Sequence, residues 1–241
     1  MVMWNYRGLG KPLTVHNIKG INKSHSPEVL FLSETKNNIS TVEGVLRRIG
    51  FQSCFAVNPT GMAGGLVVTW KEGVNVQILN HDTFFIHFIM ESQQESRKWE
   101  VIGVYLHTDE AGRDEQYTKL LQIMAHGGDQ VLLTEDFNAI RAHHEKEGGR
   151  AKSADSIQNF NDFINAGGLV DMGFEGKKFT WNNRQFGGNF IQKKLDRALV
   201  SVAWRSEFSD AFVKHLDDLG SDHKALLLCS HKEERRSKRR F

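Results

Sequence analysis

The stretch that most constrains the fold is VLLTEDFN, at residues 131–138. An apolar run of this length, leading directly into a charged residue, is typical of a buried strand. In layered α/β domains, ligands bind at the carboxyl ends of such strands. Asp136 and Asn138 are two residues apart, so on an extended chain their side chains point to the same side. The stretch therefore predicts a site for a metal ion or an activated water molecule.

A second strand, at residues 28–33, delivers Glu34 to its carboxyl end in the same way. Apolar spacing of i, i+3 and i+4 predicts helices around 15–22, 42–49, 110–124 and 157–164. Ser40 with Glu43 matches a capping box, Asp109 is a candidate N-cap, and Gly50 a stop signal. Further strands are predicted at residues 1–5, 51–57, 64–70, 74–79, 83–90, 99–106, 178–182, 194–200, 211–215 and 224–229.

The central strands follow one another at intervals of about ten residues, which favours antiparallel hairpins over βαβ units. Helices occur in both halves of the chain, so we expect two packed sheets flanked by helices. No Pro- or Ser-rich linker interrupts the 241 residues, which favours one domain over residues 1–230. Residues 231–241, with six Lys/Arg and two Glu, are expected to form a disordered basic tail.

Composition excludes several classes of protein. No apolar run approaches the roughly 18 to 20 residues that span a bilayer, and the N-terminus does not resemble a signal peptide. We therefore expect a nuclear or cytoplasmic protein, a monomer without a membrane partner, whose Cys54 and Cys229 are free thiols. Without its tail the chain has a net charge of −2, so the body is not a uniformly basic nucleic-acid platform.

Polar residues gather at the predicted strand ends, where the topology places them close together. They are Asn5, Glu34, Tyr105, Asp136, Asn138, Asp196, Asp222 and His223. Clustered carboxylates repel one another unless a cation lies among them, and oxygen ligands suit Mg²⁺ or Mn²⁺. A histidine adds a group that exchanges protons near neutral pH. Together these groups suit the metal-assisted hydrolysis of a phosphodiester.

Six blocks carry a resemblance to a known family, in this order along the chain: MWNYRGLG, FLSETK, TEDFN, FTWNN, KKLDRAL and LGSDH. They resemble the endonuclease/exonuclease/phosphatase superfamily, which includes apurinic endonucleases and DNase I. The phrases EKEGGR, FTWNNR and LDRAL, with Trp204, look more like the endonuclease domain of plant non-LTR (LINE-type) retrotransposons. The resemblance covers nearly all of residues 1–230. It implies a four-layer α/β sandwich, two mainly antiparallel β-sheets face to face with helices outside.

The resemblance also implies an activity and a set of residue roles. The activity is Mg²⁺-dependent nicking of one DNA strand, which primes reverse transcription; the reverse transcriptase to which family members are linked is absent from this chain. Glu34, Asn5 and Asp222 would lie at the metal. Asp136 would position or deprotonate the attacking water, and Asn138 would hold the phosphate. Tyr105 would contact the phosphate or leaving group, and His223, paired with Asp196, would contact the scissile phosphate or transfer a proton. Thr180 and Trp181 would line the DNA side of the pocket.

Some residues depart from the family pattern. Glu135 stands where the family usually has Gly, so a side chain must fit where the backbone approaches closely, or a negative charge is added beside the metal. Lys194 replaces an Arg before LD, Lys224-Ala225 replaces a small residue and Pro, and Leu106-His107 replaces a turn.

Three alternatives to the DNA endonuclease remain open. The first is a phosphomonoesterase of the same fold, and the second an inactive nucleic-acid-binding relic, for which Glu135 is the main argument. The third is the product of a decayed gene that folds poorly. Asp196 has a separate structural interpretation as an ion pair with Arg197 or Arg150, and His143-His144 is interpreted as surface.

Overall fold

The computed structural model describes residues 1–10, 12–61, 64–92, 97–217 and 219–230. The predicted basic tail at 231–241 lies outside the described residues.

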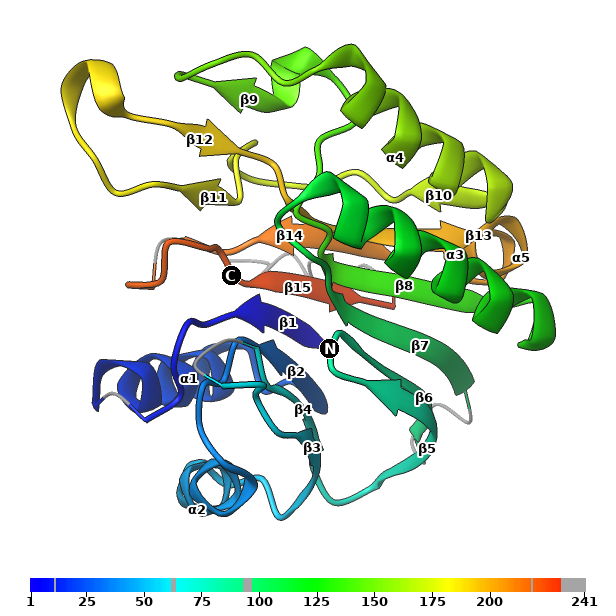
Figure 1. Cartoon of the computed structure of the whole chain (residues 1–241). Coiled ribbons are helices and arrows are strands. Elements are labelled where there is room, and N and C mark those ends of the chain that lie inside the picture. The colour runs from blue at the N-terminus through cyan, green and yellow to red at the C-terminus, as the bar shows by residue number, and fades with distance from the viewer. Residues whose placement is uncertain (11, 62–63, 93–96, 218, 231–241) are drawn as a thin grey trace, which may run out of the picture.

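Two six-stranded sheets lie face to face at the centre of the molecule (Figure 1). The first sheet has the order β14 (Phe212–His215), β15 (Leu226–Cys229), β1 (Val2–Asn5), β2 (Val29–Ser33), β4 (Leu66–Trp70) and β3 (Ser53–Val57). The second has the order β10 (Leu169–Asp171), β13 (Asp196–Ser201), β8 (Val131–Asp136), β7 (Arg97–Tyr105), β6 (Phe85–Ser92) and β5 (Val74–Asp82).

Each sheet is antiparallel except at its central pair of strands. β1 runs parallel to β2, and the chain between them forms helix α1 (Pro12–His25). β7 runs parallel to β8, and the chain between them forms α3 (Glu110–His126). The carboxyl ends of β1, β2, β7 and β8 carry Asn5, Glu34, Tyr105 and Asp136, so the two parallel pairs position most of the predicted site.

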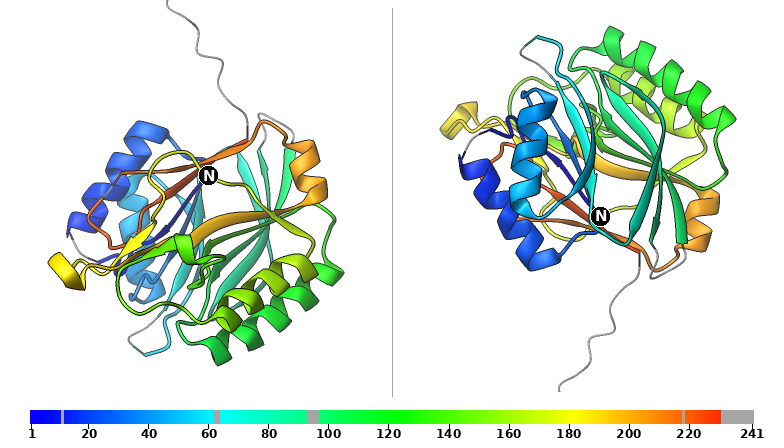
Figure 2. Two further views of the ribbon diagram at one scale, coloured as in Figure 1. Left: turned by 90° about the horizontal axis from the view of Figure 1, so that it is seen from above. Right: turned by 90° about the horizontal axis from the view of Figure 1, so that it is seen from below.

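Helices cover the outer face of each sheet, as the two views of Figure 2 show. α1 and α2 (Ile39–Ile49) pack on the first sheet, and α3 and α4 (Ala154–Ala166) on the second. This arrangement is the predicted four-layer α/β sandwich. A short helix, α5 (Val202–Glu207), follows β13 and was not predicted from the sequence. None of the helices in the described ranges is long and apolar enough to cross a bilayer.

The core between the sheets consists of side chains that alternate along the strands. Phe31 from the first sheet and Phe88 and Leu132 from the second are fully buried there. Gly103 lets the sheets approach closely, because a Cβ at this position would lie 2.4 Å from the ring of Phe31. Trp204 of α5 closes one end of this core and is also fully buried. Burying each such side chain contributes roughly 1.5–3 kcal/mol.

The helix boundaries test the predicted capping residues. Asp109 caps α3 by accepting a hydrogen bond from the Gly112 amide, and Gly50 ends α2 in the left-handed conformation, as predicted. The predicted capping box of Ser40 with Glu43 is wrong. Asn38 is the N-cap of α2, and Ser40 lies inside the first turn, where its hydroxyl donates to the Asn38 side chain.

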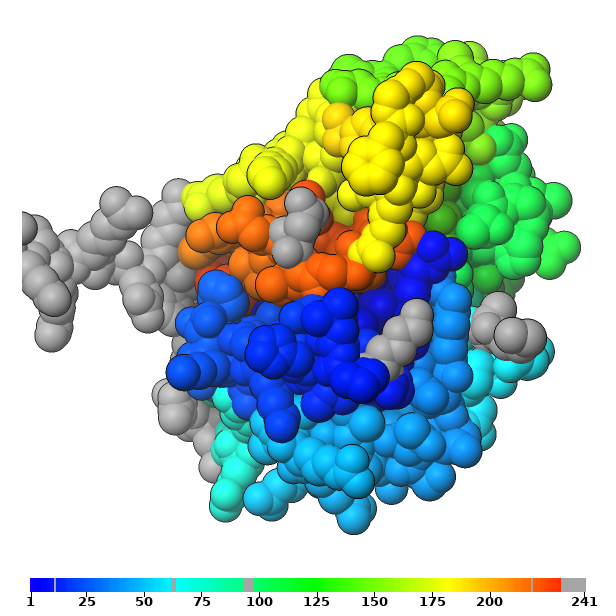
Figure 3. Space-filling view, turned by 90° about the vertical axis from the view of Figure 1, so that its left-hand side faces the viewer, coloured from blue at the N-terminus to red at the C-terminus, as the bar shows by residue number. Residues whose placement is uncertain are grey.

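A small third sheet lies beside the sandwich. Its strands are β11 (Trp181–Asn182), β12 (Gln192–Lys193) and β9 (Lys146–Glu147). Single-turn 3-10 helices occur before β9 at His143–Glu145 and in the β11–β12 loop at Gly187–Asn189. In the space-filling view of Figure 3, this loop (yellow) projects above the first helix (blue) and the segment that precedes β15 (orange).

Candidate functional site

Three polar residues form a row across neighbouring strands of the second sheet. Tyr105 of β7 pairs in register with Asp136 of β8, which pairs in turn with Asp196 of β13. Asp136 and Asp196 are fully buried or nearly so, with 0% and 1% of their surface exposed. Like charges directly opposite on paired strands destabilise a sheet. The pair therefore requires a cation.

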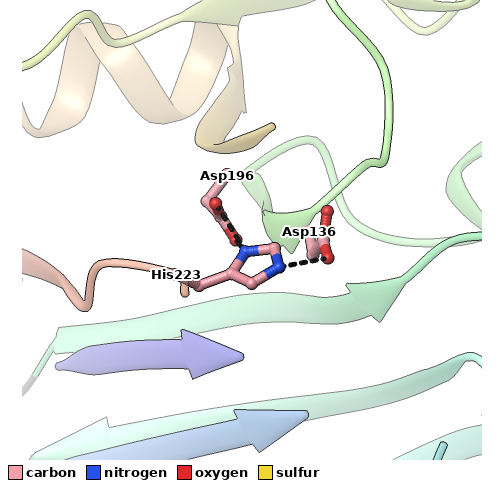
Figure 4. Close-up of side chains that lie close together, drawn as sticks. All are labelled: Asp136, Asp196 and His223. Atoms are coloured by element: carbon pink, nitrogen blue, oxygen red, sulfur yellow. Dashed lines mark hydrogen bonds and ion pairs between the residues drawn. The ribbon is translucent and has the colours of Figure 1, made fainter. Parts of the chain in front are cut away.

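His223, which precedes β15, provides this cation (Figure 4). Its Nδ1 lies 3.0 Å from both carboxylate oxygens of Asp196, and its Nε2 lies 3.7 Å from Oδ2 of Asp136. Burial lowers the pKa of His223, but the charges of Asp196 and Asp136 outweigh this effect and raise the pKa to about 10. The imidazole is therefore protonated at neutral pH.

The first sheet contributes Asn5 and Glu34 to the same place. The Asn5 Nδ2 donates to Oδ2 of Asp136 over 2.9 Å and reaches Oε1 of Glu34 over 3.5 Å. The Tyr105 hydroxyl donates to the same Glu34 oxygen over 2.7 Å. Burial raises the pKa of Tyr105 far above its usual range, and this hydrogen bond and the Glu34 charge raise it further, so the phenol keeps its proton. These contacts join the two sheets through their strand ends.

Two cations neutralise Glu34 on its outer side. The Nζ of Lys36 lies 2.8 Å and the Nε of Arg7 3.4 Å from Oε2 of Glu34. Arg7 also reaches Oδ2 of Asp222 over 2.5 Å, and this oxygen accepts a hydrogen bond from the Trp181 indole over 3.0 Å. Asp222 thus lies on the far side of Arg7 from Glu34. Arg7 was not among the site residues predicted from the sequence.

Asn138 reaches the site by a different geometry from the one predicted. β8 ends at Asp136, and Asn138 has a left-handed backbone with a φ of 49°. Its amide donates to Oδ1 of Asp136 over 2.9 Å, and its Nδ2 donates to the Leu106 carbonyl over 2.7 Å. The two side chains meet because the chain turns back at the strand end.

The two residues that were predicted to line the DNA side of the pocket lie in different environments. Trp181 is half-buried and lines the pocket of the site. Thr180 is fully buried, and its hydroxyl accepts hydrogen bonds from the amides of Leu195 and Asp196, both over 3.0 Å. The predicted contact of Thr180 with substrate is therefore corrected: its side chain holds the start of β13, and so Asp196, in place.

Several groups at the site are suited to a divalent cation. The Oδ1 of Asn5 is buried and has no hydrogen-bond partner among the described residues, and the Nδ2 of the same side chain lies 3.5 Å from Oε1 of Glu34. Such oxygen ligands suit a hard ion. Asp136, Asp196 and His223 also lie close enough together to share an ion. A protonated imidazole cannot ligate a metal, so the side of the site with Glu34 and Asn5 fits the ion better.

These side chains open into a pocket of about 230 Å³. Glu34, Tyr105, Asp136, Asn138 and His223 form one part of its lining. Cations form another part, and they are Arg7, Lys146, Lys152 and Lys193. The three lysines were not predicted as site residues, because the sequence around them shows no pattern beyond polar composition.

Glu135 lies directly beneath the site. Its backbone φ is 102°, a conformation that favours glycine, and its side chain is 1% exposed. One carboxyl oxygen accepts hydrogen bonds from the Ser33 hydroxyl and the Asp136 amide, both over 2.8 Å, while Oε1 has no partner among the described residues. Burial raises the pKa of Glu135 well above its usual range, and the charges of Asp196 and Asp136 raise it further. The expected negative charge is thus disfavoured in the folded protein, and the residue also has backbone strain and a buried oxygen without a partner among the described residues.

Replacement of Glu135 by glycine should therefore stabilise the protein and raise the rate of any catalysis at this site. Relief of the left-handed strain contributes ~1–3 kcal/mol, partly offset by ~0.5–1 kcal/mol for the greater freedom of unfolded glycine. We expect the free energy of unfolding in urea to rise by about 1 kcal/mol. Glu135→Ala is the matched control, because it removes the carboxyl but keeps the strain. A glycine variant no more stable than the alanine variant would contradict the role of strain.

Behind the site, a buried ion network fixes the loop that leads to β9. The Arg197 guanidinium is 1% exposed and contacts Oε2 of Glu145 over 2.7 Å and Oδ2 of Asp171 over 2.8 Å. The Lys194 Nζ adds a contact of 3.2 Å with Asp171. Arg197 thus pairs with these acids and not with Asp196, which pairs with His223. His143 is exposed, as expected, but Glu145 at the end of the same short helix is buried.

Fold and site together define a two-sheet α/β sandwich with carboxylates and an imidazole at its strand ends. The sequence matches the family described as Endonuclease/Exonuclease/phosphatase over residues 4–223. The chain belongs to this family, whose members are hydrolytic nucleases or phosphatases. A search among curated proteins gave no match.

Solved structures with the same fold cover nearly the whole chain. The AP endonuclease LMAP from Leishmania major is 15% identical, with a TM-score of 0.73 over 93% of this chain and 85% of that one. A 3′ phosphatase from Neisseria, bound to a product DNA hairpin, is 17% identical, with a TM-score of 0.69 over 93% and 96%. The endonuclease domain of TRAS1, a telomere-specific non-LTR retrotransposon, is 14% identical, with a TM-score of 0.69 over 94% and 95%. At these identities the similarity establishes the fold alone.

Proposed function

We propose that the protein is a Mg²⁺-dependent DNA endonuclease that nicks one strand by attack of water on a phosphodiester. The observation that carries the proposal is the buried Asp136–His223–Asp196 arrangement, which is hydrogen-bonded through Asp136 to Asn5 and opens into a cation-lined pocket that Glu34 also lines. In a retrotransposon of the plant LINE type, a nick of this kind would prime reverse transcription.

The residues of the chain divide the chemistry between them. Burial raises the pKa of Asp136 to about 7, although His223 opposes this rise, so the carboxylate can accept a proton from water near neutral pH. His223 keeps its proton and stabilises negative charge that develops on the phosphate. Asp196 orients His223 through Nδ1. Asn138 orients Asp136 through its amide, and its side chain lies where it can contact a phosphate oxygen.

Glu34 and Asn5 would hold the metal ion, whereas Asp222, which was also predicted at the metal, is separated from Glu34 by Arg7 and contacts Arg7 and Trp181. A bound Mg²⁺ or Mn²⁺ would supply positive charge to the phosphoryl oxygens. Tyr105 keeps the Glu34 carboxylate in position by donating to Oε1. Lys36 and Arg7 neutralise the same carboxylate from outside.

A phosphomonoesterase of the same fold is the second candidate. The observation that favours it is the small size of the pocket, about 230 Å³, which has room for a terminal phosphate group. A third candidate is a catalytically weakened relic, favoured by the strain at Glu135.

Nicking of supercoiled plasmid DNA separates these candidates. We expect the protein with 5–10 mM Mg²⁺, roughly the concentration that fills weak sites, to convert supercoiled DNA into nicked circles. Chelation by EDTA should stop the conversion, and added Mg²⁺ should restore it. Release of inorganic phosphate from a 3′-phosphorylated oligonucleotide, measured in parallel, detects the phosphomonoesterase. Phosphate release without nicking would replace the proposal with the second candidate. Absence of both activities would support the catalytically weakened relic.

A further inference from the structure

Three lysines line the same pocket as the proposed metal-binding residue Glu34, and they lie close enough together to repel one another. Lys146 of β9 and Lys193 of β12 are directly paired in the small antiparallel sheet. Trp181 of β11 pairs with Lys193 on its other side. Lys152 lines the same pocket. Like charges at directly paired positions destabilise a sheet, so this pairing costs free energy unless an anion lies against it.

The described residues provide little compensating negative charge for this pair. The Lys146 Nζ donates to the carbonyl oxygens of Gly148 and Arg150, which are neutral. The Lys193 Nζ lies 4.8 Å from the centre of the Trp181 ring. No carboxylate in the described part of the chain forms an ion pair with either lysine. Lys152 differs, because it contacts Glu110 over 2.8 Å.

Burial and the repulsion among the lysines lower the pKa of Lys193. Burial has the largest effect, the charges of Lys146 and Lys152 lower the pKa further, and Asp136 provides a weaker opposing effect. An anion between these ammonium groups would remove the repulsion. The indole of Trp181 holds the aliphatic stem of Lys193 beside the pocket and adds a cation–π contact.

We propose that Lys146 and Lys193, with Lys152 beside them, form a second anion site, which binds the phosphate next to the one that is cleaved. This inference rests on the proposed function, since it assumes that a phosphodiester lies at Asp136 and His223. It adds a requirement for substrates with neighbouring phosphates along a polynucleotide chain. A substrate with one phosphate leaves these lysines without a ligand.

The kinetic test compares two substrates for each variant. One is bis(p-nitrophenyl) phosphate, which contains a single phosphodiester, and the other is a DNA duplex of about 20 base pairs, enough to cover the site. We expect Lys193→Met and Lys146→Met each to lower the ratio of kcat/KM for the duplex to that for the small diester about tenfold or more. Lys193→Arg, which keeps the charge, should restore most of the ratio. Lys98→Met is the control, because Lys98 is exposed on β7 and does not line this pocket.

Binding provides a readout that does not depend on catalysis. Affinity for the same duplex is measured in the His223→Ala background by fluorescence anisotropy between 50 and 200 mM salt, a range over which phosphate contacts change affinity strongly. Each lysine-to-methionine change should reduce the slope of log K against log salt by about 0.9. Slopes equal to that of Lys98→Met would overturn the lysine site. Absence of cleavage by the wild-type protein, together with a reduced slope in the variants, would instead reject the proposed hydrolysis and keep the anion site.

Discussion

Replacement of His223 by alanine should lower the rate of plasmid nicking about 10²- to 10⁴-fold. The imidazole is the only described cation between Asp136 and Asp196, and its loss leaves two buried carboxylates opposed across paired strands. Loss of the imidazole removes the charge that lowers the pKa of Asp136, so Asp136 takes up a proton and can no longer accept one from water. The measurement is the initial rate of nicked-circle formation, with the secondary structure of the variant checked by circular dichroism.

His16→Ala is the matched control, since His16 is an exposed histidine on α1. Asp196→Asn tests the partner of the imidazole. It should lower the pKa of His223 below the value of about 10 that the intact arrangement maintains, which NMR titration of the imidazole can follow. A His223→Ala protein that nicks within threefold of the wild-type rate would remove His223 from the mechanism.

Replacement of Arg197 by methionine should produce the largest change in stability. Removing one partner of a buried ion pair leaves the others without compensation, which costs ~3 kcal/mol or more. Glu145 and Asp171 would both lose the guanidinium that they contact at 2.7 and 2.8 Å. We expect a corresponding decrease in the free energy of unfolding in urea. Lys178→Met, which removes an exposed contact with Glu147, is the control and should change stability by less than about 0.5 kcal/mol.

The loss of stability in Arg197→Met should depend on pH. Burial alone would raise the pKa of Asp171, but the charges of Arg197 and Lys194 lower it to about 2. A carboxyl whose pKa is lowered by folding stabilises the protein above its unfolded pKa, here near 3.8, and loses this effect as the pH falls through about 2. The difference in stability between wild type and Arg197→Met should therefore shrink as the pH falls toward 2, where Asp171 takes up a proton in the wild type as well. A difference independent of pH would show that packing, and not charge, accounts for the loss.

The sequence predicted the layers of the fold well, because apolar periodicity reports burial directly. The strands that deliver Asn5, Glu34, Tyr105 and Asp136 were recognisable as short apolar runs, and the structure brings their ends together. The roles of these residues remain proposals. Ser40 shows the limit of local patterns: it fits a capping motif, but Asn38, two residues earlier, makes the capping bond.

Features that depend on long-range contacts were not predictable from local patterns. The buried position of Thr180 follows from its contacts with the start of β13, 15 and 16 residues away. The ion network of Arg197 joins residues separated by as many as 52 positions, and an isolated Glu145 looks like any loop carboxylate. At Glu135 the sequence revealed the unusual residue but not the rise in its pKa. That rise depends on burial and on charges from neighbouring strands.

The strand order also has a consequence for protein synthesis. Asn5 lies on β1 near the beginning of the chain, whereas His223 precedes β15, which must be made before it can pair with β1. While the ribosome is still translating the middle of the message, the nascent chain contains Glu34 and Asp136 but not the imidazole that lies between Asp136 and Asp196. A chain translated only as far as residue 222 would therefore lack the imidazole of the proposed mechanism, and the site is complete only once β15 has paired with β1.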